Sequence, residues 1–318
     1  MILISGRKMA IENKNNSPSE LTFEYKVPGK WILSGEHSVI RGSEALVFPL
    51  TSRYLQFRYF KSHQDFTLSV GGQYKGDLEL FIWSVIEKYL NELKMTRDQL
   101  KGHLDLQCEI QFGAGMGASA TLAVGLSLFF YQLGYLKTDL FEFSKKIEDL
   151  FHGESSGVDV AVALNAKPLI FKRGNANQFL TQYKLPKLCI SYSGVRGVTK
   201  DCVDKVKALL QSDPEKYRMV DEKMSLSVQL LKKLISEPSE DSLWVEALTL
   251  AQSCFIDWEL VPYEAQKHIN SLNQAGALSC KMTGSGGGGY ILSLWPSSFD
   301  LNTLDKNLRT QLIKIESR

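Results

Sequence analysis

The sequence FGAGMGASAT, residues Phe112–Thr121, is the stretch that decides the fold of this chain. Gly113, Gly115 and Gly117 alternate with small or apolar residues, so the backbone can take positive φ values and approach a ligand without interference from a Cβ atom. Residues 119–133 read as a helix, so the N–H groups of the loop converge on a helix N-terminus. The loop therefore predicts a site for an anion such as phosphate, with a tight strand-to-helix connection as the structural alternative.

The spacing of these glycines differs from two familiar nucleotide-binding motifs. It is Gly-x-Gly-x-Gly rather than the Gly-x-Gly-x-x-Gly of a dinucleotide-binding fold, and no acidic residue follows in a strand at the usual distance. Gly29-Lys30 does not form a nucleoside-triphosphate P-loop either, because Trp31 replaces the required hydroxyl and Glu24 replaces the first glycine. A different kind of phosphate-binding loop is indicated.

The composition describes a chain that can bury one or two hydrophobic cores. It has 318 residues, 44% of them hydrophobic, and this length favours two domains or one large one. The net charge is +2 with both signs interspersed, so nucleic acid is not an expected partner. The five cysteines are odd in number and lack a Cys-x-x-Cys pair, which favours reduced thiols in a cytoplasmic protein. We expect neither disulfides nor a structural zinc ion.

No stretch of the sequence is a good candidate for a secretory or membrane-spanning segment. The apolar run in MILISGRKMA is too short for a signal peptide, and its basic residues follow the run. Residues 122–136 form the longest apolar run, but Ser127, Gln132 and Gly134 interrupt it and it is too short for a membrane span. We expect a buried core helix there, and a flexible leader at residues 1–20, which end in a polar stretch rich in Pro, Ser and Asn.

Hydrophobic periodicity predicts strands and helices that do not alternate regularly, which favours an α+β fold over a doubly wound sheet. Strands are expected at 21–27, 30–35 and 44–49, separated by Pro28-Gly29, Gly35 and Gly42, and at 54–59, 65–70, 103–111, 188–194 and on both sides of a glycine turn within 280–294. Helices are expected at 78–93, 119–133, 139–149, 199–210, 214–235, 242–255, 262–273 and 301–315. The stripe expected to face the core in the 78–93 helix is Leu80, Trp83, Ile86, Leu90 and Leu93.

Two carboxylates stand out in the middle of the chain. Glu148 lies near the C-terminal end of the predicted 139–149 helix, where a negative charge is unfavourable for the helix dipole and so needs a reason. Asp159 is the single carboxylate within the short apolar segment VDVAVAL, residues 158–164.

Three separated stretches resemble the ordered motifs of one superfamily. They are VPGKWILSGEHSVIRG at 27–42, FGAGMGASAT at 112–121 and KMTGSGGGG at 281–289. In this order they resemble the motifs of the galactokinase, homoserine kinase, mevalonate kinase and phosphomevalonate kinase (GHMP) superfamily. FHGESSGVDVAVAL at 151–164 is similar to the mevalonate kinase segment that carries a catalytic aspartate, and the resemblance covers about residues 22–295.

The resemblance implies a two-lobed α+β GHMP kinase fold with ATP and an alcohol acceptor between the lobes. The N-terminal lobe is expected at 21–185, and the C-terminal lobe, an antiparallel sheet covered by helices, at 186–318. Residues 38–42 after Gly-Glu-His follow the mevalonate kinase pattern, whereas galactokinases place an aspartate there. The implied activity is ATP- and Mg²⁺-dependent phosphorylation of the primary hydroxyl of mevalonate in isoprenoid biosynthesis.

The resemblance also implies roles for individual residues in phosphoryl transfer, which needs neutralised phosphates, aligned reactants and an oriented or deprotonated hydroxyl. Asp159 would orient the hydroxyl or accept its proton, and Lys30 would pair with Asp159 and attract the γ-phosphate. Ser119 and Glu148 would bind Mg²⁺. The residues implied at the nucleotide are Gly113, Ala114, Gly115, Met116, Gly117, Ala118, Ser119 and Ser156, and those implied at the acceptor are Glu36, His37, Arg196, Thr199, Gly284 and Gly286.

Ordinary structural roles remain open for several of these residues. Lys30 and Asp159 could form a structural ion pair, and His37 could be a hydrogen-bonded histidine after a turn. Ser156 could cap a loop, Arg196 could be an exposed loop charge, and the glycines of 284–289 could form a flexible hairpin turn.

The chain also departs from the family pattern. Ala118 replaces the first of two serines, Gln111 replaces a proline, and 253–269 lacks an asparagine and a glycine that relatives often carry. Phosphomevalonate kinase, another small-molecule kinase of the family, and a catalytically silent regulator that binds ATP or a metabolite are therefore alternatives. Retention of Lys30, Ser119 and both carboxylates argues against the silent regulator. A homodimer is compatible with the sequence.

Overall fold

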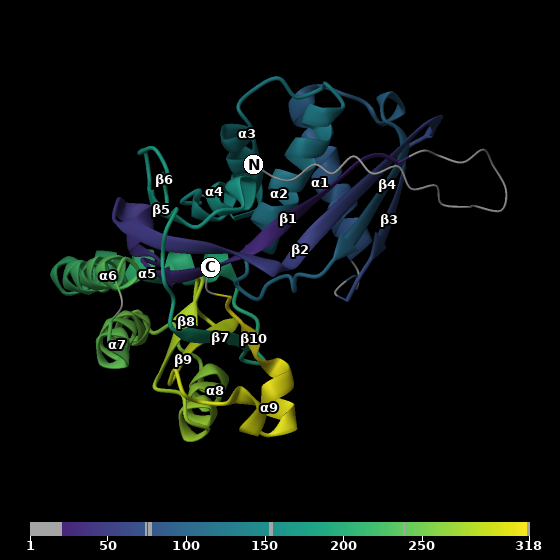
Figure 1. Cartoon of the computed structure of the whole chain (residues 1–318). Helices are drawn as coiled ribbons and strands as arrows, with labels where there is room; N and C mark the ends of the chain where they lie inside the picture. Colours follow the sequence, from purple (N-terminus) through teal and green to yellow (C-terminus); the bar gives the residue numbers. More distant parts are fainter. Residues whose placement is uncertain (1–20, 74, 76–77, 153–154, 238, 317–318) are drawn as a thin grey trace.

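The structure is a computed structural model that describes residues 21–73, 75, 78–152, 155–237 and 239–316 (Figure 1). The predicted leader, residues 1–20, lies outside the described residues. Two separate sheets with helices packed on them form a mixed α+β architecture, so the predicted fold class is confirmed. No helix in the described part of the chain is long and apolar enough to cross a membrane. All five cysteines are buried free thiols.

The first sheet is built around a long antiparallel pair of strands, β1 and β2, with the order β3-β4-β2-β5-β6 and β1 paired to β2. Its strands are β1 (Leu21–Ser34), β2 (Glu44–Asp65), β3 (Thr67–Gly71), β4 (Lys101–Cys108), β5 (Leu169–Lys172) and β6 (Gln178–Phe179). Pairing is antiparallel except between β3 and β4, which run parallel.

Two predicted strand breaks are wrong, because β1 continues through Pro28-Gly29 and β2 runs through residues 50–53. The register shifts there instead: Pro28 pairs with Tyr54, whereas Gly29 pairs with Leu50, so β2 bulges between them. Gly29 has no room for a side chain, since a Cβ atom would lie 3.2 Å from the Met116 carbonyl oxygen. The predicted break at Pro28-Gly29 is therefore not a turn between two strands, because β1 continues there opposite a bulge of β2.

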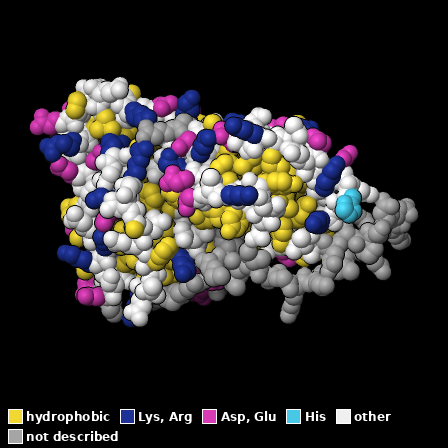
Figure 2. Space-filling model, turned by 90° about the horizontal axis from the view of Figure 1, so that it is seen from above, with side chains coloured by type: hydrophobic (Ala, Val, Ile, Leu, Met, Phe, Trp, Pro, Cys, Tyr) yellow, Lys and Arg dark blue, Asp and Glu magenta, His cyan; other side chains and the backbone are white. Residues whose placement is uncertain are grey.

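Four helices cover one face of the first sheet, at the top of Figure 1. They are α1 (Leu78–Leu93), α2 (Ala118–Gln132), α3 (Leu140–His152) and α4 (Val158–Asn165). The apolar run at 122–136 forms most of α2, which is buried on nearly all sides as predicted. Seen from above, Lys, Arg, Asp and Glu side chains are interspersed over this part of the surface (Figure 2).

The bounds predicted for α1 are confirmed, but its predicted core stripe is partly wrong. Leu80 is 79% exposed, because at 3.6 residues per turn it lies on the face opposite to the buried stripe. The residues that α1 buries are Ile82, Val85, Ile86, Tyr89 and Leu90.

The second sheet has the order β10-β7-β9-β8 and is antiparallel throughout. Its strands are β7 (Lys187–Tyr192), β8 (Ser279–Thr283), β9 (Tyr290–Trp295) and β10 (Ile313–Lys314). The helices of this half are α5 (Thr199–Ser212), α6 (Pro214–Leu234), α7 (Asp241–Asp257), α8 (Tyr263–Gln274) and α9 (Lys306–Gln311). Short 3₁₀ helices are η1 (Ser38–Arg41), η2 (Arg97–Gln99) and η3 (Leu301–Thr303).

The predicted helix at 301–315 is wrong, because the segment divides into η3, α9 and β10. Asp300 and Asp305 each accept a hydrogen bond from a backbone N–H two residues later, so each starts its own short helix. Leu304, between them, is extended. Ile313 then pairs with Ile190 and completes the sheet edge. Local capping and sheet pairing override the helical periodicity here.

The two sheets share a hydrophobic core. Leu188 and Leu292 of the second sheet belong to the same buried cluster as Leu33 and Phe48 of the first. Polar contacts cross the same junction, because the hydroxyl oxygens of Ser34 and Ser227 lie 2.8 Å apart. The two halves of the chain are therefore packed against each other over a buried, largely apolar surface.

Gly125 in α2 yields the first testable prediction. A Cβ atom there would lie 2.0 Å from the Phe57 ring, which is fully buried and stacked on Tyr25 at 5.1 Å. Gly125→Ala would raise helix propensity by about 1 kcal/mol, but the overpacked ring should lower the free energy of unfolding by roughly 1–3 kcal/mol overall. Urea unfolding measures the difference. Gln132→Ala, at an exposed position of the same helix, should change it by under about 0.5 kcal/mol, and a stabilised Gly125→Ala protein would contradict the packing.

Candidate active site

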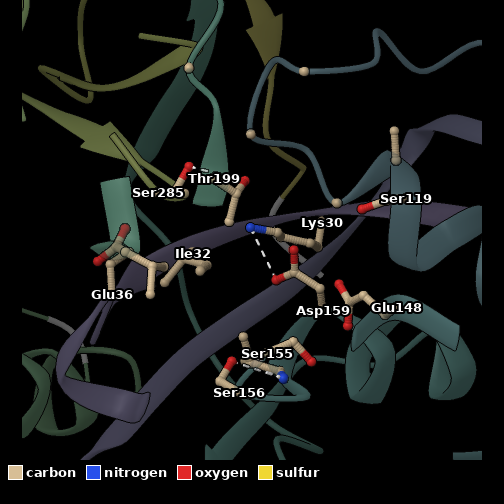
Figure 3. Close-up of a pocket in the computed structure, with 18 of the residues that line it drawn as sticks. Lys30, Ile32, Glu36, Ser119, Glu148, Ser155, Ser156, Asp159, Thr199 and Ser285 are labelled. Carbon is tan, nitrogen blue, oxygen red and sulfur yellow. Dashed lines mark hydrogen bonds and ion pairs between the residues drawn. The ribbon is translucent and has the colours of Figure 1, made fainter. Parts of the chain in front are cut away.

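One cavity of about 510 Å³ lies where the first glycine loop, β1 and the β8–β9 turn meet (Figure 3). Most of the residues singled out in the sequence line it, although they come from segments far apart in the chain. The predicted residues in its wall are Lys30, Glu36, His37, Gly113, Gly115, Gly117, Ala118, Ser119, Glu148, Ser156, Asp159, Arg196, Thr199 and Gly284. The predicted residues outside the wall are Ala114, Met116 and Gly286.

The glycine loop has the predicted backbone conformation. Gly113, Gly115 and Gly117 have φ values of 73°, 84° and 69°. Ala114 and Met116 turn their side chains into the core instead, where they are 0% and 2% exposed. Gly117 is the N-cap of α2 and provides no side-chain cap, so the first N–H groups of the helix need other acceptors. A phosphate oxygen bound at this end of the cavity would supply them.

The β8–β9 turn packs directly on the first glycine loop. A Cβ atom on Gly284 would lie 2.8 Å from the Gly115 carbonyl oxygen, and one on Gly289 would lie 2.5 Å from that of Ala114. This backbone contact explains the glycines of KMTGSGGGG. Gly286 faces the other way, since its Cβ atom would meet Leu260 at 2.8 Å.

Lys30 and Asp159 form an ion pair under the glycine loop, with Lys30 Nζ 3.1 Å from Asp159 Oδ1 (Figure 3). Asp159 lies in the first turn of α4, and its side chain is 23% exposed. Lys30 is almost fully buried on β1, and its backbone N–H donates to the Met116 carbonyl at 3.0 Å. A Cβ atom on Gly117 would lie 3.0 Å from Lys30 Cγ and 3.2 Å from Asp159 Oδ2. The loop can cover the pair only because residue 117 is glycine.

Glu148 points from α3 toward the same place, beside Asp159 (Figure 3). It is 5% exposed, and its Oε2 atom has no hydrogen-bond partner in the described part of the chain. Burial, and then the charge of Asp159, raise the pKa of Glu148 to about 8. A buried, unpartnered carboxylate oxygen is unfavourable unless a cation binds it.

The residues present fit a magnesium ion. Mg²⁺ prefers oxygen ligands, keeps several waters and takes few ligands from protein when phosphate oxygens are available. Glu148 offers the unpartnered oxygen, and the Ser119 side chain lines the same cavity from the start of α2. Within the described residues, no three His, Cys, Asp or Glu side chains form a metal site by themselves. Phosphate would therefore have to complete the coordination.

His37 is buried and hydrogen-bonded, which agrees with the structural role considered for it in the sequence. It also lines the cavity. Its Nε2 atom lies 2.9 Å from the Ser285 carbonyl oxygen, so this nitrogen carries the proton and donates. Its ring packs near Phe255 and Trp258. Burial lowers the pKa of His37 to about 4, so the ring is neutral at physiological pH.

The remaining predicted residues divide between the two ends of the cavity. Arg196 lies against the glycine loop, since its Cδ atom would be 3.6 Å from a Cβ on Gly113. Thr199 begins α5, and its hydroxyl oxygen lies 3.3 Å from that of Ser285. Ser156 Oγ accepts a hydrogen bond from the Val158 N–H. This bond agrees with the loop-capping role considered for Ser156 in the sequence.

Several residues of the cavity and its support were not singled out in the sequence. Phe81 of α1 and Phe112 line the cavity together, with ring centroids 5.7 Å apart. No sequence spacing links them, so only the fold could reveal the pair. Ser285 and Lys281 lie within KMTGSGGGG, whose glycines carry the resemblance. Their position in this motif was the sequence feature that could have identified them as residues of the site or its support.

Comparison with known proteins agrees with this fold. The family described as GHMP kinases N terminal domain matches residues 81–167. The crystal structure of L. major mevalonate kinase in complex with R-mevalonate has the same fold, with a TM-score of 0.69, 21% identity and coverage of 92% of this chain and 91% of that one. Residues 81–167 are therefore similar to the N-terminal domain of the GHMP kinase superfamily.

Within that superfamily the chain is similar to mevalonate kinases. The mevalonate kinase of Pyrococcus abyssi is 26% identical over 294 residues, covering 85% of this chain and 87% of the relative. The mevalonate kinase of Pyrococcus horikoshii is 28% identical over 298 residues, with the same coverage. The similarity therefore spans nearly the whole of these relatives.

The buried His37 makes stability depend on pH. Its pKa falls from the ordinary 6.5 to about 4 on folding, so below pH 6.5 the unfolded chain binds a proton that the folded chain does not. The stabilisation is complete above pH 6.5 and is lost as pH falls toward 4, a change of about 3 kcal/mol. Urea unfolding of wild type and His37→Gln at about pH 7, 5.5 and 4.5 should show a shallower pH dependence in the variant.

Exposed His63 provides the matched control. His63→Gln should keep the wild-type slope of unfolding free energy against pH. Parallel curves for wild type and His37→Gln would mean that the His37 ring is not buried as a neutral group.

Proposed function

We propose that the protein is an ATP- and Mg²⁺-dependent mevalonate kinase that transfers the γ-phosphate of ATP to the primary hydroxyl of mevalonate, an early step of isoprenoid biosynthesis. The observation that carries this proposal is the Lys30–Asp159 ion pair directly under a glycine loop that begins a helix. A phosphate held by the loop would lie next to both a cation and a carboxylate. The similarity to mevalonate kinases is the reason for proposing mevalonate as the acceptor.

Different residues of this chain would have different roles in phosphoryl transfer. The glycine loop and the first turn of α2 would bind the nucleotide phosphates through backbone N–H groups. Lys30 would neutralise charge on the transferred group and hold the Asp159 carboxylate in position through their ion pair. Asp159 would orient the acceptor hydroxyl and accept its proton as the phosphoryl group transfers. Ser119 and Glu148 would hold Mg²⁺, which supplies charge neutralisation for the phosphate oxygens when it is bound.

The acceptor end of the cavity favours an unphosphorylated acceptor. Ile32, Val39, Ile40 and Val158 line it, and the charged side chain that reaches it is Glu36. Lys30 and Arg196 are the cations among the described lining residues, and both lie against the glycine loop. A second phosphate on the acceptor would have no dedicated cation, so phosphomevalonate is the less suitable acceptor.

The resemblance implied Arg196 at the acceptor, but its side chain lies against the glycine loop, so we propose it for the nucleotide side and keep Thr199 on the acceptor side. A cytoplasmic location is part of the proposal, since buried free thiols suit a reducing compartment. A homodimer is compatible with it.

ADP release with Mg²⁺, ATP and a panel of alcohols tests the proposal. Mevalonate should support turnover, whereas phosphomevalonate, galactose and homoserine should not, because the described residues that line the acceptor end are largely apolar and add no cation for a second phosphate. Turnover with phosphomevalonate in place of mevalonate would reassign the acceptor. ATP binding without turnover on any of them would favour the silent regulator.

Asp159→Asn tests the role of the carboxylate. Loss of the proton acceptor should lower kcat by roughly 10²- to 10⁴-fold, while the affinity for MgADP should change little because the loop and α2 are intact. Asp65→Asn is the matched control, since Asp65 forms an ion pair with Lys101 at 2.9 Å outside the cavity wall. Its kcat should stay near that of wild type. Near-normal turnover by Asp159→Asn would remove Asp159 from the mechanism.

A further inference from the structure

A second lysine–carboxylate pair lies behind the acceptor end of the cavity and has no part in the mechanism above. Lys281 Nζ of β8 donates to Glu36 Oε1 at 2.6 Å, and the two side chains are 0% and 1% exposed. Taking both charges out of water is expensive, so a pair this deeply buried is weak support for stability alone. Its burial therefore calls for a functional reason.

The two oxygens of Glu36 have different surroundings. Oε1 is bound by Lys281, whereas Oε2 is buried and has no hydrogen-bond partner in the described part of the chain. Glu36 lines the cavity, as do its neighbours Ile32 and His37, but Lys281 does not. A buried carboxylate oxygen without a donor is unfavourable. A hydroxyl of a bound acceptor would provide the missing donor.

Lys281 is held in place independently of Glu36. Thr283, two residues along β8, accepts from the Ile32 N–H at 2.9 Å and donates to the Ile32 carbonyl at 3.0 Å. Lys281 Nζ lies 3.4 Å from the same carbonyl and 5.4 Å from the centre of the Phe255 ring. β8 is therefore fastened to β1 between Lys30 and Glu36. The Lys281 ammonium group is therefore held in position, and it in turn fixes the position of the Glu36 carboxylate.

We propose that Lys281 is a positioning residue of the acceptor site, which fixes one oxygen of Glu36 so that the other is presented to a hydroxyl of the bound alcohol. The inference rests on the proposed function, because it needs an alcohol acceptor in the cavity. Lys281 itself touches neither the acceptor nor the nucleotide. Its effect reaches the substrate through the orientation and charge of Glu36.

A double-mutant cycle separates this role from a purely structural one. Lys281→Met, Glu36→Gln and the double variant are compared with wild type for KM of mevalonate, kcat, MgADP affinity and melting temperature. Each single variant should raise KM by roughly 10- to 100-fold, as expected for a lost hydrogen bond to a charged group. The double variant should raise KM no further, because Lys281 acts through Glu36. MgADP affinity should stay within about twofold of wild type, since the nucleotide side is untouched.

Melting temperature distinguishes the two roles. The double variant removes the unpaired buried charge, so it should melt above Lys281→Met while keeping the raised KM. If the KM and the melting temperature of the double variant both return to the wild-type values, the role of the Lys281–Glu36 pair is structural only. If Lys281→Met does not fold, comparison of Glu36→Gln with the double variant decides: equal KM values support the inference, and a further multiplicative rise overturns it.

Lys232→Met is the matched control. Lys232 of α6 also pairs with a glutamate across the two halves, Glu44 at 2.7 Å, but this pair is about one-third exposed and lies outside the cavity wall. Its KM should equal that of wild type. Wild-type protein without turnover of mevalonate would overturn the proposed function and this inference with it. Turnover by wild type with an unchanged KM in Lys281→Met would overturn the inference alone.

Discussion

The close approach of the glycine loop to β1 is the constraint on which the rest of the site depends. The Lys30 N–H donates to Met116, and the absence of a side chain at Gly117 lets the loop lie over the Lys30–Asp159 pair. Any larger residue at 117 would need to displace either the lysine stem or the carboxylate, and would be strained at a φ of 69°. The charge pair, the N-terminal end of α2 and the loop are therefore a single unit.

The second half of the chain completes that unit from the other side. Gly284 and Gly289 bring the β8–β9 turn against the loop backbone, and Thr283 fastens β8 to Ile32. Because the two sheets also share one buried cluster, the cavity walls belong to a common core rather than to two loosely linked lobes. Such a core holds functional groups in fixed positions, which phosphoryl transfer requires.

Three carboxyl groups line the cavity in different surroundings. Asp159 has a lysine at 3.1 Å and some solvent, and Glu36 has a lysine at 2.6 Å and none. Glu148 has neither a lysine partner nor a bond to its Oε2 atom, and burial with the neighbouring Asp159 raises its pKa to about 8. The difference suits three roles: an ionised group at the reacting hydroxyl, a positioned acceptor of hydrogen bonds, and a ligand that becomes ionised when a cation binds.

The sequence by itself determined the α+β class, most helices and the positive φ values of the glycine loop, because these follow from local periodicity and from the spacing of the glycines. The pairing of Lys30 with Asp159 was implied by the resemblance to GHMP kinases. Only the tertiary structure decided that β1 continues through Pro28-Gly29 opposite a bulge of β2 and that Leu80 faces solvent, since both depend on what packs alongside. It also decided the Glu36–Lys281 pair, 245 residues apart, and the Phe81–Phe112 contact. No local pattern encodes such contacts, because a charge is buried or a ring is brought to a cavity only when two distant strands or helices meet.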